Sequence, residues 1–110
     1  MTYKGALIGT GAKRRSEEGG GGFGIGRIHA KCWSMTRGAA LAAACDIREE
    51  NLHEFMADFG LTAGYTDYRE LLRSTKPDIV DICTWPGLHF EMAMAAQAGV
   101  KGIYLEKPMV

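Results

Sequence analysis

The chain has 110 residues, of which 46% are hydrophobic and 24% charged, and its 13 lysines and arginines balance its 13 aspartates and glutamates. This length and composition support one globular domain, and the zero net charge argues against general capture of nucleic acid or an anionic membrane. The longest apolar stretch, residues 39–45, is far too short to span a bilayer. The three cysteines stand alone without a C-x-x-C pair, so we expect no metal site, no disulfide framework and a cytoplasmic location.

Hydrophobic periodicity predicts strands that alternate with helices along the whole chain. In chain order, we predict a strand over residues 3–9, a helix over 25–35, a strand over 40–46, a helix over 52–59 that ends at Gly60, a very short strand within 63–67, a small helix capped by Asp67, a strand over 78–84, a helix over about 88–98 and a strand over 102–108. This alternation predicts the α/β class, as a doubly wound and mostly parallel sheet with helices on both faces, the Rossmann fold.

The glycine-rich stretch "GTGAKRRSEEGGGGFGIGRIHA" (residues 9–30) lies between the first predicted strand and the first predicted helix. A strand, a G-x-G turn and a third glycine that opens a helix form the dinucleotide fingerprint, in which the helix N-terminus faces the pyrophosphate. The contiguous motif fails, because position 14 is Arg14. No P-loop motif is present, and a kinase glycine loop would need companion motifs that are missing here.

The position of the acidic residue after the second strand tests whether this stretch is one loop. That residue, which binds the adenosine ribose, should follow the fingerprint by about 20 residues. Asp46 follows Gly26 by 20 residues, whereas it follows Gly11 by 35. We therefore interpret residues 12–24 as an insertion into a single phosphate-binding loop; the alternative is a flexible surface linker.

Two further segments follow predicted strands at the edge of the sheet where doubly wound folds bind their ligands. "TWPGLHFEMA" begins at Thr84 and "YLEKP" begins at Tyr104. Spacing alone would favour a surface turn for the second segment. With "ALIGTG", "GIGRIHA", "AACDI" and "YTDYRELL" in order, however, the chain resembles over essentially its whole length the N-terminal domain of the Gfo/Idh/MocA oxidoreductases, the glucose–fructose oxidoreductase and inositol dehydrogenase family.

This resemblance implies an NAD- or NADP-dependent oxidoreductase that acts on a hydroxyl carbon of a sugar, cyclitol or related polyol. Asp46 would favour NAD because its charge repels a 2′-phosphate, whereas Arg48 leaves NADP open. Lys107 would be catalytic and would contact the reacting hydroxyl. The implied cofactor-binding residues are Gly9, Thr10, Gly11, Gly26, Arg27, Ile28, Asp46, Thr84, Pro86, His89, Glu106 and Lys107. A non-catalytic dinucleotide-binding or regulatory module is the alternative, and a methyltransferase is a more distant one.

Other features carry weaker expectations. His29 matches a family "RIHA" segment, but a helix-packing histidine is an equally good interpretation, and Trp33 is expected to pack. Family members continue beyond E-K-P with a second α/β domain that supplies other acid–base residues, the substrate pocket and an oligomer interface. The resemblance therefore implies that residues 1–110 are a dinucleotide-binding domain that is incomplete at its C-terminus and inactive in isolation, and it allows a homo-oligomer.

Overall fold

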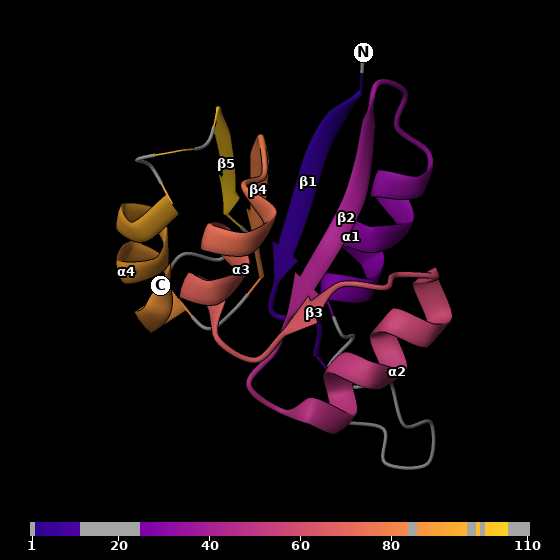
Figure 1. The fold of residues 1–110 in the computed structure, drawn as a ribbon, viewed down its shortest axis with the longest axis horizontal. Helices are drawn as coiled ribbons and strands as arrows, with labels where there is room; N and C mark the ends of the chain where they lie inside the picture. Colours follow the sequence, from indigo (N-terminus) through magenta and orange to yellow (C-terminus); the bar gives the residue numbers. More distant parts are fainter. Residues whose placement is uncertain (1, 12–24, 84–85, 97–98, 100, 106–110) are drawn as a thin grey trace.

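A five-stranded sheet forms the middle of the molecule in the computed structural model, which describes residues 2–11, 25–83, 86–96, 99 and 101–105 (Figure 1). The strands are β1 (Tyr3–Ile8), β2 (Ala39–Cys45), β3 (Gly64–Tyr65), β4 (Ile79–Ile82) and β5 (Gly102–Leu105). Their order is β3-β2-β1-β4-β5, and every pairing is parallel. This is the order of the doubly wound dinucleotide-binding folds, so the predicted fold class is confirmed.

Helices cover both faces of this sheet. They are α1 (Ile25–Ser34), α2 (Glu49–Phe59), α3 (Tyr68–Thr75) and α4 (Pro86–Ala96). Neighbouring residues of β1 point to opposite faces, because the pleat alternates their side chains. Leu7 packs with Leu52 and Phe55 of α2, and Ile8 packs in a second cluster that includes Leu71 of α3. Burial on both faces explains why the strands read as unbroken apolar runs.

Local signals set most of the helix ends. The Asp67 carboxylate accepts the Arg69 N–H at 2.9 Å and caps α3 as predicted, a contact that stabilises a helix by about 1 kcal/mol. Gly60 ends α2 in the left-handed conformation with φ 69°, also as predicted. The predicted start of the last helix near residue 88 was wrong, since α4 begins at Pro86. Proline suits the first helical position, where its missing N–H would have no partner.

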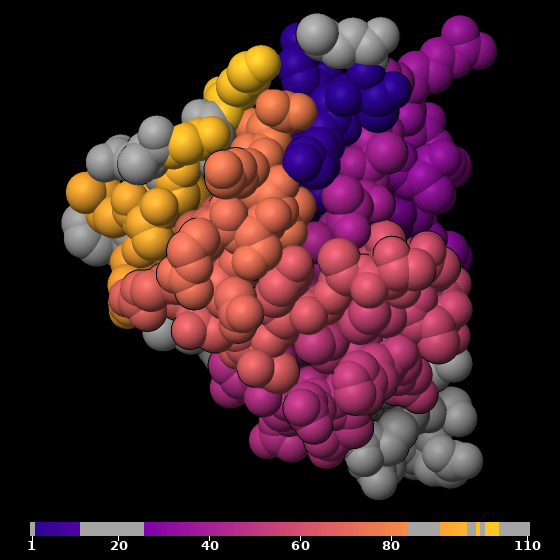
Figure 2. Space-filling model, in the orientation of Figure 1, coloured from indigo at the N-terminus to yellow at the C-terminus, as the bar shows by residue number. Residues whose placement is uncertain are grey.

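The surface view shows how α2, α3 and α4 lie along one side of the molecule. In Figure 2, α3 lies in the middle of the visible surface, with α4 and the yellow β5 on one side and α2 on the other. No helix in the described part of the chain has the length and apolar character that crossing a lipid bilayer would require.

Candidate cofactor-binding site

The turn after β1 has a backbone shape that requires glycine. Gly9 has φ 98° and Gly11 has φ 72°, values that residues with a side chain rarely adopt. Thr10 between them is buried. The Gly9 N–H donates to the Cys45 carbonyl at 2.8 Å, which ties the turn to the end of β2. The turn therefore lies at the carboxyl edge of the sheet, next to the residue that follows β2.

That residue, Asp46, joins the two loops with one carboxylate. Its Oδ2 accepts the Thr10 hydroxyl at 2.9 Å and the Gly11 N–H at 3.0 Å. Its Oδ1 accepts the Arg48 N–H at 2.9 Å at the start of α2. An ionised carboxylate has about four acceptor positions, so these three donors leave room for another.

Helix α1 packs against the Gly9–Gly11 turn at Gly26. A Cβ built on Gly26 would overlap the Gly9 carbonyl oxygen and would lie 2.9 Å from the Thr10 carbonyl oxygen. Only glycine fits here without a shift of the backbone, which is the close helix–strand packing expected of a third fingerprint glycine. Residues 12–24, the predicted insertion, lie outside the described residues, but the segments that flank them meet at this point.

The Arg27 side chain is directed away from the turn. Its Nη1 lies 2.7 Å from Asp58 Oδ2, and its Nη2 lies 3.8 Å from Glu54 Oε1. The guanidinium also stands over the Phe55 and Phe59 rings, 5.8 and 5.9 Å from their centroids. The structure therefore brings the Arg27 side chain to α2, where its Nε and Nη2 are buried without a hydrogen-bond partner among the described residues.

The remaining predicted residues are placed in part or not at all. Ile28, one position further along α1, is 43% exposed. Pro86 and His89 lie in the first turns of α4, which follows β4. Since β1 and β4 are parallel neighbours, α4 starts at the same sheet edge as the glycine turn. Thr84, Glu106 and Lys107 lie outside the described residues.

A buried polar cluster on the α1 face of the sheet was not predicted from the sequence. His29 Nδ1 lies 2.8 and 2.9 Å from the two Asp81 carboxylate oxygens, and the Trp33 Nε1–H donates to Asp81 Oδ2 at 2.9 Å. Cys83 Sγ lies 3.3 Å from His29 Nδ1 and 3.4 Å from Asp81 Oδ1. Trp33 packs as expected, with its Cζ3 2.6 Å from a Cβ built on Gly5. The available signal was Asp81 itself, a charged residue inside the otherwise apolar strand "IVDI".

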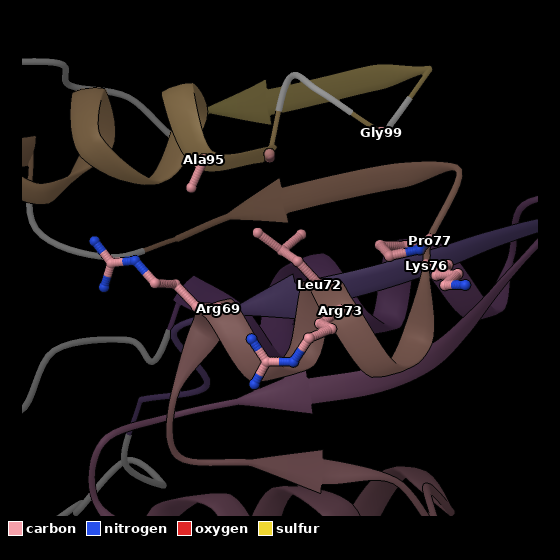
Figure 3. Close-up of a pocket in the computed structure, with 8 residues that line it drawn as sticks. Arg69, Leu72, Arg73, Lys76, Pro77, Ala95 and Gly99 are labelled. Carbon is pink, nitrogen blue, oxygen red and sulfur yellow. The ribbon is translucent and has the colours of Figure 1, made fainter.

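An open groove of about 550 Å³ lies elsewhere, between α3 and α4 (Figure 3). It is lined by Arg69, Leu72, Arg73, Lys76, Pro77, Ala95, Ala96 and Gly99. Pro77 precedes β4, and Gly99 precedes β5. The groove therefore lies toward the amino ends of these strands, opposite the edge that carries the glycine turn, and it contains none of the predicted site residues.

Comparison with known proteins gives consistent matches. Residues 19–110 match Gfo/Idh/MocA, the oxidoreductase family with an NAD-binding Rossmann fold. The myo-inositol 2-dehydrogenase of Thermotoga maritima is 34% identical over 85 residues, covering 77% of this chain and 25% of that protein. The inositol 2-dehydrogenase of Pseudomonas fluorescens is 32% identical over 99% of this chain and 30% of its own.

A solved structure agrees with these relatives. The myo-inositol dehydrogenase from Lactobacillus casei, in complex with NAD(H) and myo-inositol, superposes with a TM-score of 0.80 at 30% identity, covering 100% of this chain and 30% of that one. The chain thus spans 25% to 30% of the length of these relatives. The sequence matches and the strand order lead to one conclusion: the chain belongs to the Gfo/Idh/MocA oxidoreductase family, within its NAD-binding Rossmann fold.

Proposed function

We propose that the chain binds NAD at the turn after β1, the N-terminus of α1 and Asp46. The observation that carries this proposal is the Asp46 carboxylate, which the Thr10 hydroxyl and the Gly11 N–H hold beside the glycine turn. Gly26 brings the start of α1 against the same turn, so closely that a Cβ there would overlap the Gly9 carbonyl oxygen. A pyrophosphate needs close approach to backbone N–H groups and favours the positive end of a helix. A turn made of glycines against the start of α1 fits that group.

Asp46 supports NAD as the preferred dinucleotide. One acceptor position of its carboxylate is left for a ribose hydroxyl, since three donors already bind it. A 2′-phosphate at the same place would meet the negative charge of this carboxylate. The Arg48 side chain is exposed nearby, so we rank NADP second. Thr84, Pro86, His89 and Glu106 stay proposed contacts to the nicotinamide half.

The proposed reaction is oxidation of a hydroxyl carbon on a cyclitol or related polyol, because the relatives are named as inositol dehydrogenases. Bound NAD supplies the hydride acceptor. Lys107 is proposed to hold and polarise the reacting hydroxyl, and a Lys107→Met variant of a form that turns over substrate would test that role. The three cysteines are present as free thiols, which supports our proposal of a cytoplasmic location. We also propose that the protein self-associates, and this proposal rests on the family alone.

Titration of NAD and NADP into the wild-type chain and Asp46→Ala tests the site. We expect Asp46→Ala to raise the Kd for NAD about tenfold or more, because it removes a charged hydrogen-bond acceptor. The preference for NAD over NADP should also shrink, since the repelling charge is gone. Glu50→Ala, which removes an exposed carboxylate from α2, is the matched control and should bind like the wild type. Equal NAD affinities of Asp46→Ala and the wild type would remove Asp46 from the site.

A further inference from the structure

His29, Asp81 and Cys83 form a buried cluster of metal-ligating side chains, and none of them is among the residues assigned to NAD. His29 is 8% exposed and Asp81 is 3% exposed, while Cys83 is half-buried and gives the cluster a route from solvent. One ligand atom from each residue lies within 4.8 Å of the others. We propose that these three side chains bind a thiophilic divalent cation, Zn²⁺ by preference.

The separations of the ligand atoms are close to those of a tetrahedral site. Zn²⁺ binds imidazole nitrogen and carboxylate oxygen at about 2.0 Å and thiolate sulfur at about 2.3 Å, which places tetrahedral ligand atoms about 3.3 to 3.5 Å apart. In this structure His29 Nδ1 and Asp81 Oδ1 are 2.8 Å apart, and Cys83 Sγ lies 3.3 and 3.4 Å from them. Small side-chain shifts therefore suffice to seat the cation.

The charges of the three ligands also match a divalent cation. A buried carboxylate is costly unless it is paired or coordinates a metal. Asp81 and the Cys83 thiolate would together neutralise a doubly charged ion, and His29 would bind as the neutral imidazole. Binding would release the thiol proton to solvent, and the neutral imidazole, which ligates through Nδ1, would carry its one proton on Nε2.

The surrounding structure already orients the carboxylate. Trp33 Nε1–H holds Asp81 Oδ2, while Oδ1 faces His29 and Cys83. Outer hydrogen bonds of this kind fix the orientation of metal ligands. Asp81 and Cys83 are two apart along the chain at the end of β4 and therefore share one face of the sheet, and His29 approaches from α1. Because His29 and Asp81 are 52 residues apart, motif spacing predicted no metal here.

Cobalt titration of the reduced chain in the absence of NAD tests the site. We expect Co²⁺ to give the visible bands of a tetrahedral ion and a thiolate-to-cobalt charge-transfer band, and Zn²⁺ to remove both by displacement. Cys83→Ser should abolish the charge-transfer band. Cys32→Ser, which changes an exposed thiol on the same helix as His29, should keep it. His29→Asn and Asp81→Asn should each weaken the affinity about tenfold or more.

Two further measurements test the site even if the His29, Asp81 or Cys83 variants do not fold. Trp33→Phe keeps the aromatic packing against Gly5 and should keep the charge-transfer band, with an affinity weakened about 10- to 100-fold. In the wild type, Zn²⁺ should slow alkylation of Cys83 while Cys32 reacts at an unchanged rate. The proposal is overturned if circular dichroism shows a folded wild type that gives no thiolate band with saturating Co²⁺, or if Cys83→Ser keeps the band. Neither result depends on whether the chain binds NAD.

Discussion

Gly26 is the residue at which α1 meets the turn after β1 without room for a methyl group. The expected overlap with the Gly9 and Thr10 carbonyl oxygens would push α1 away from the turn. We therefore expect Gly26→Ala to lower the free energy of unfolding by about 1 to 3 kcal/mol and to weaken NAD binding. Urea unfolding and NAD titration measure the two effects.

Gly99 offers a matched control for this substitution. A Cβ on Gly99 would meet nothing within 4 Å, and no left-handed φ is found there. Gly99→Ala should therefore keep both stability and affinity. If Gly26→Ala unfolded and bound NAD as the wild type does, the close approach at this glycine would have no part in the site.

Residue spacing could predict Gly26 and Asp46 but not how their groups interact. The 20-residue separation follows from the length of one helix and one strand, so it is readable along the chain. It does not say that the Asp46 carboxylate turns back to Thr10 and Gly11, because that contact depends on how two loops lie at the sheet edge. The contact between His29 and Asp81 could not be predicted for the same reason, because α1 and β4 become neighbours only after folding.

Between elements, Arg27 connects α1 to α2. Its guanidinium pairs with Asp58 and stands over Phe55 and Phe59. We expect Arg27→Ala to lower the free energy of unfolding by about 1 kcal/mol, since it removes a partly exposed ion pair together with cation–π contacts. NAD affinity should change little, because the Arg27 guanidinium is engaged by Asp58, Phe55 and Phe59 of α2.

Lys31→Ala, which removes an exposed cation from the same helix, serves as the control and should leave stability near the wild-type value. Thermal unfolding and NAD titration of the three proteins separate the two roles of Arg27. A large loss of NAD affinity in Arg27→Ala with no loss of stability would show that the guanidinium itself binds the dinucleotide.

Element boundaries were predictable where one residue decides them. Asp67 caps α3 and Gly60 ends α2 through backbone groups only a few residues away, so the sequence carries the whole signal. The start of α4 was harder to place, because proline suits both the end of a strand segment and the first position of a helix. Pro86 takes the helical role here.

At the scale of the whole molecule, the alternation of elements predicted the architecture, because right-handed crossovers leave few ways to arrange parallel strands. The division of the core into two clusters was not assigned from the sequence. Strands buried on both faces show no polar side from which the direction of each residue could be read. Leu7 and Ile8 are both fully apolar, yet they face opposite helix layers.

The buried core also makes stability depend on pH through Cys45. Burial, followed by the charges of Asp46 and Asp67, raises the pKa of this thiol from 9.0 to about 12. A folded-state pKa above the unfolded value means that the stabilisation is complete below pH 9 and is lost as the pH rises toward 12, because only the unfolded chain then ionises the thiol. From pH 8 to pH 10 this thiol should cost the folded state about 1.4 kcal/mol.

Cys45→Ala isolates this contribution from the other groups that titrate at alkaline pH. Urea unfolding of the reduced wild type and Cys45→Ala at pH 8 and pH 10 gives four free energies of unfolding. The wild type should lose more stability between the two pH values than the variant, because the variant has no thiol that ionises on unfolding. The expected difference follows from the burial of Cys45 among Ala43, Leu71 and Val80. Equal losses in the two proteins would contradict the prediction, because Cys45 would then ionise as easily in the folded core as in the unfolded chain.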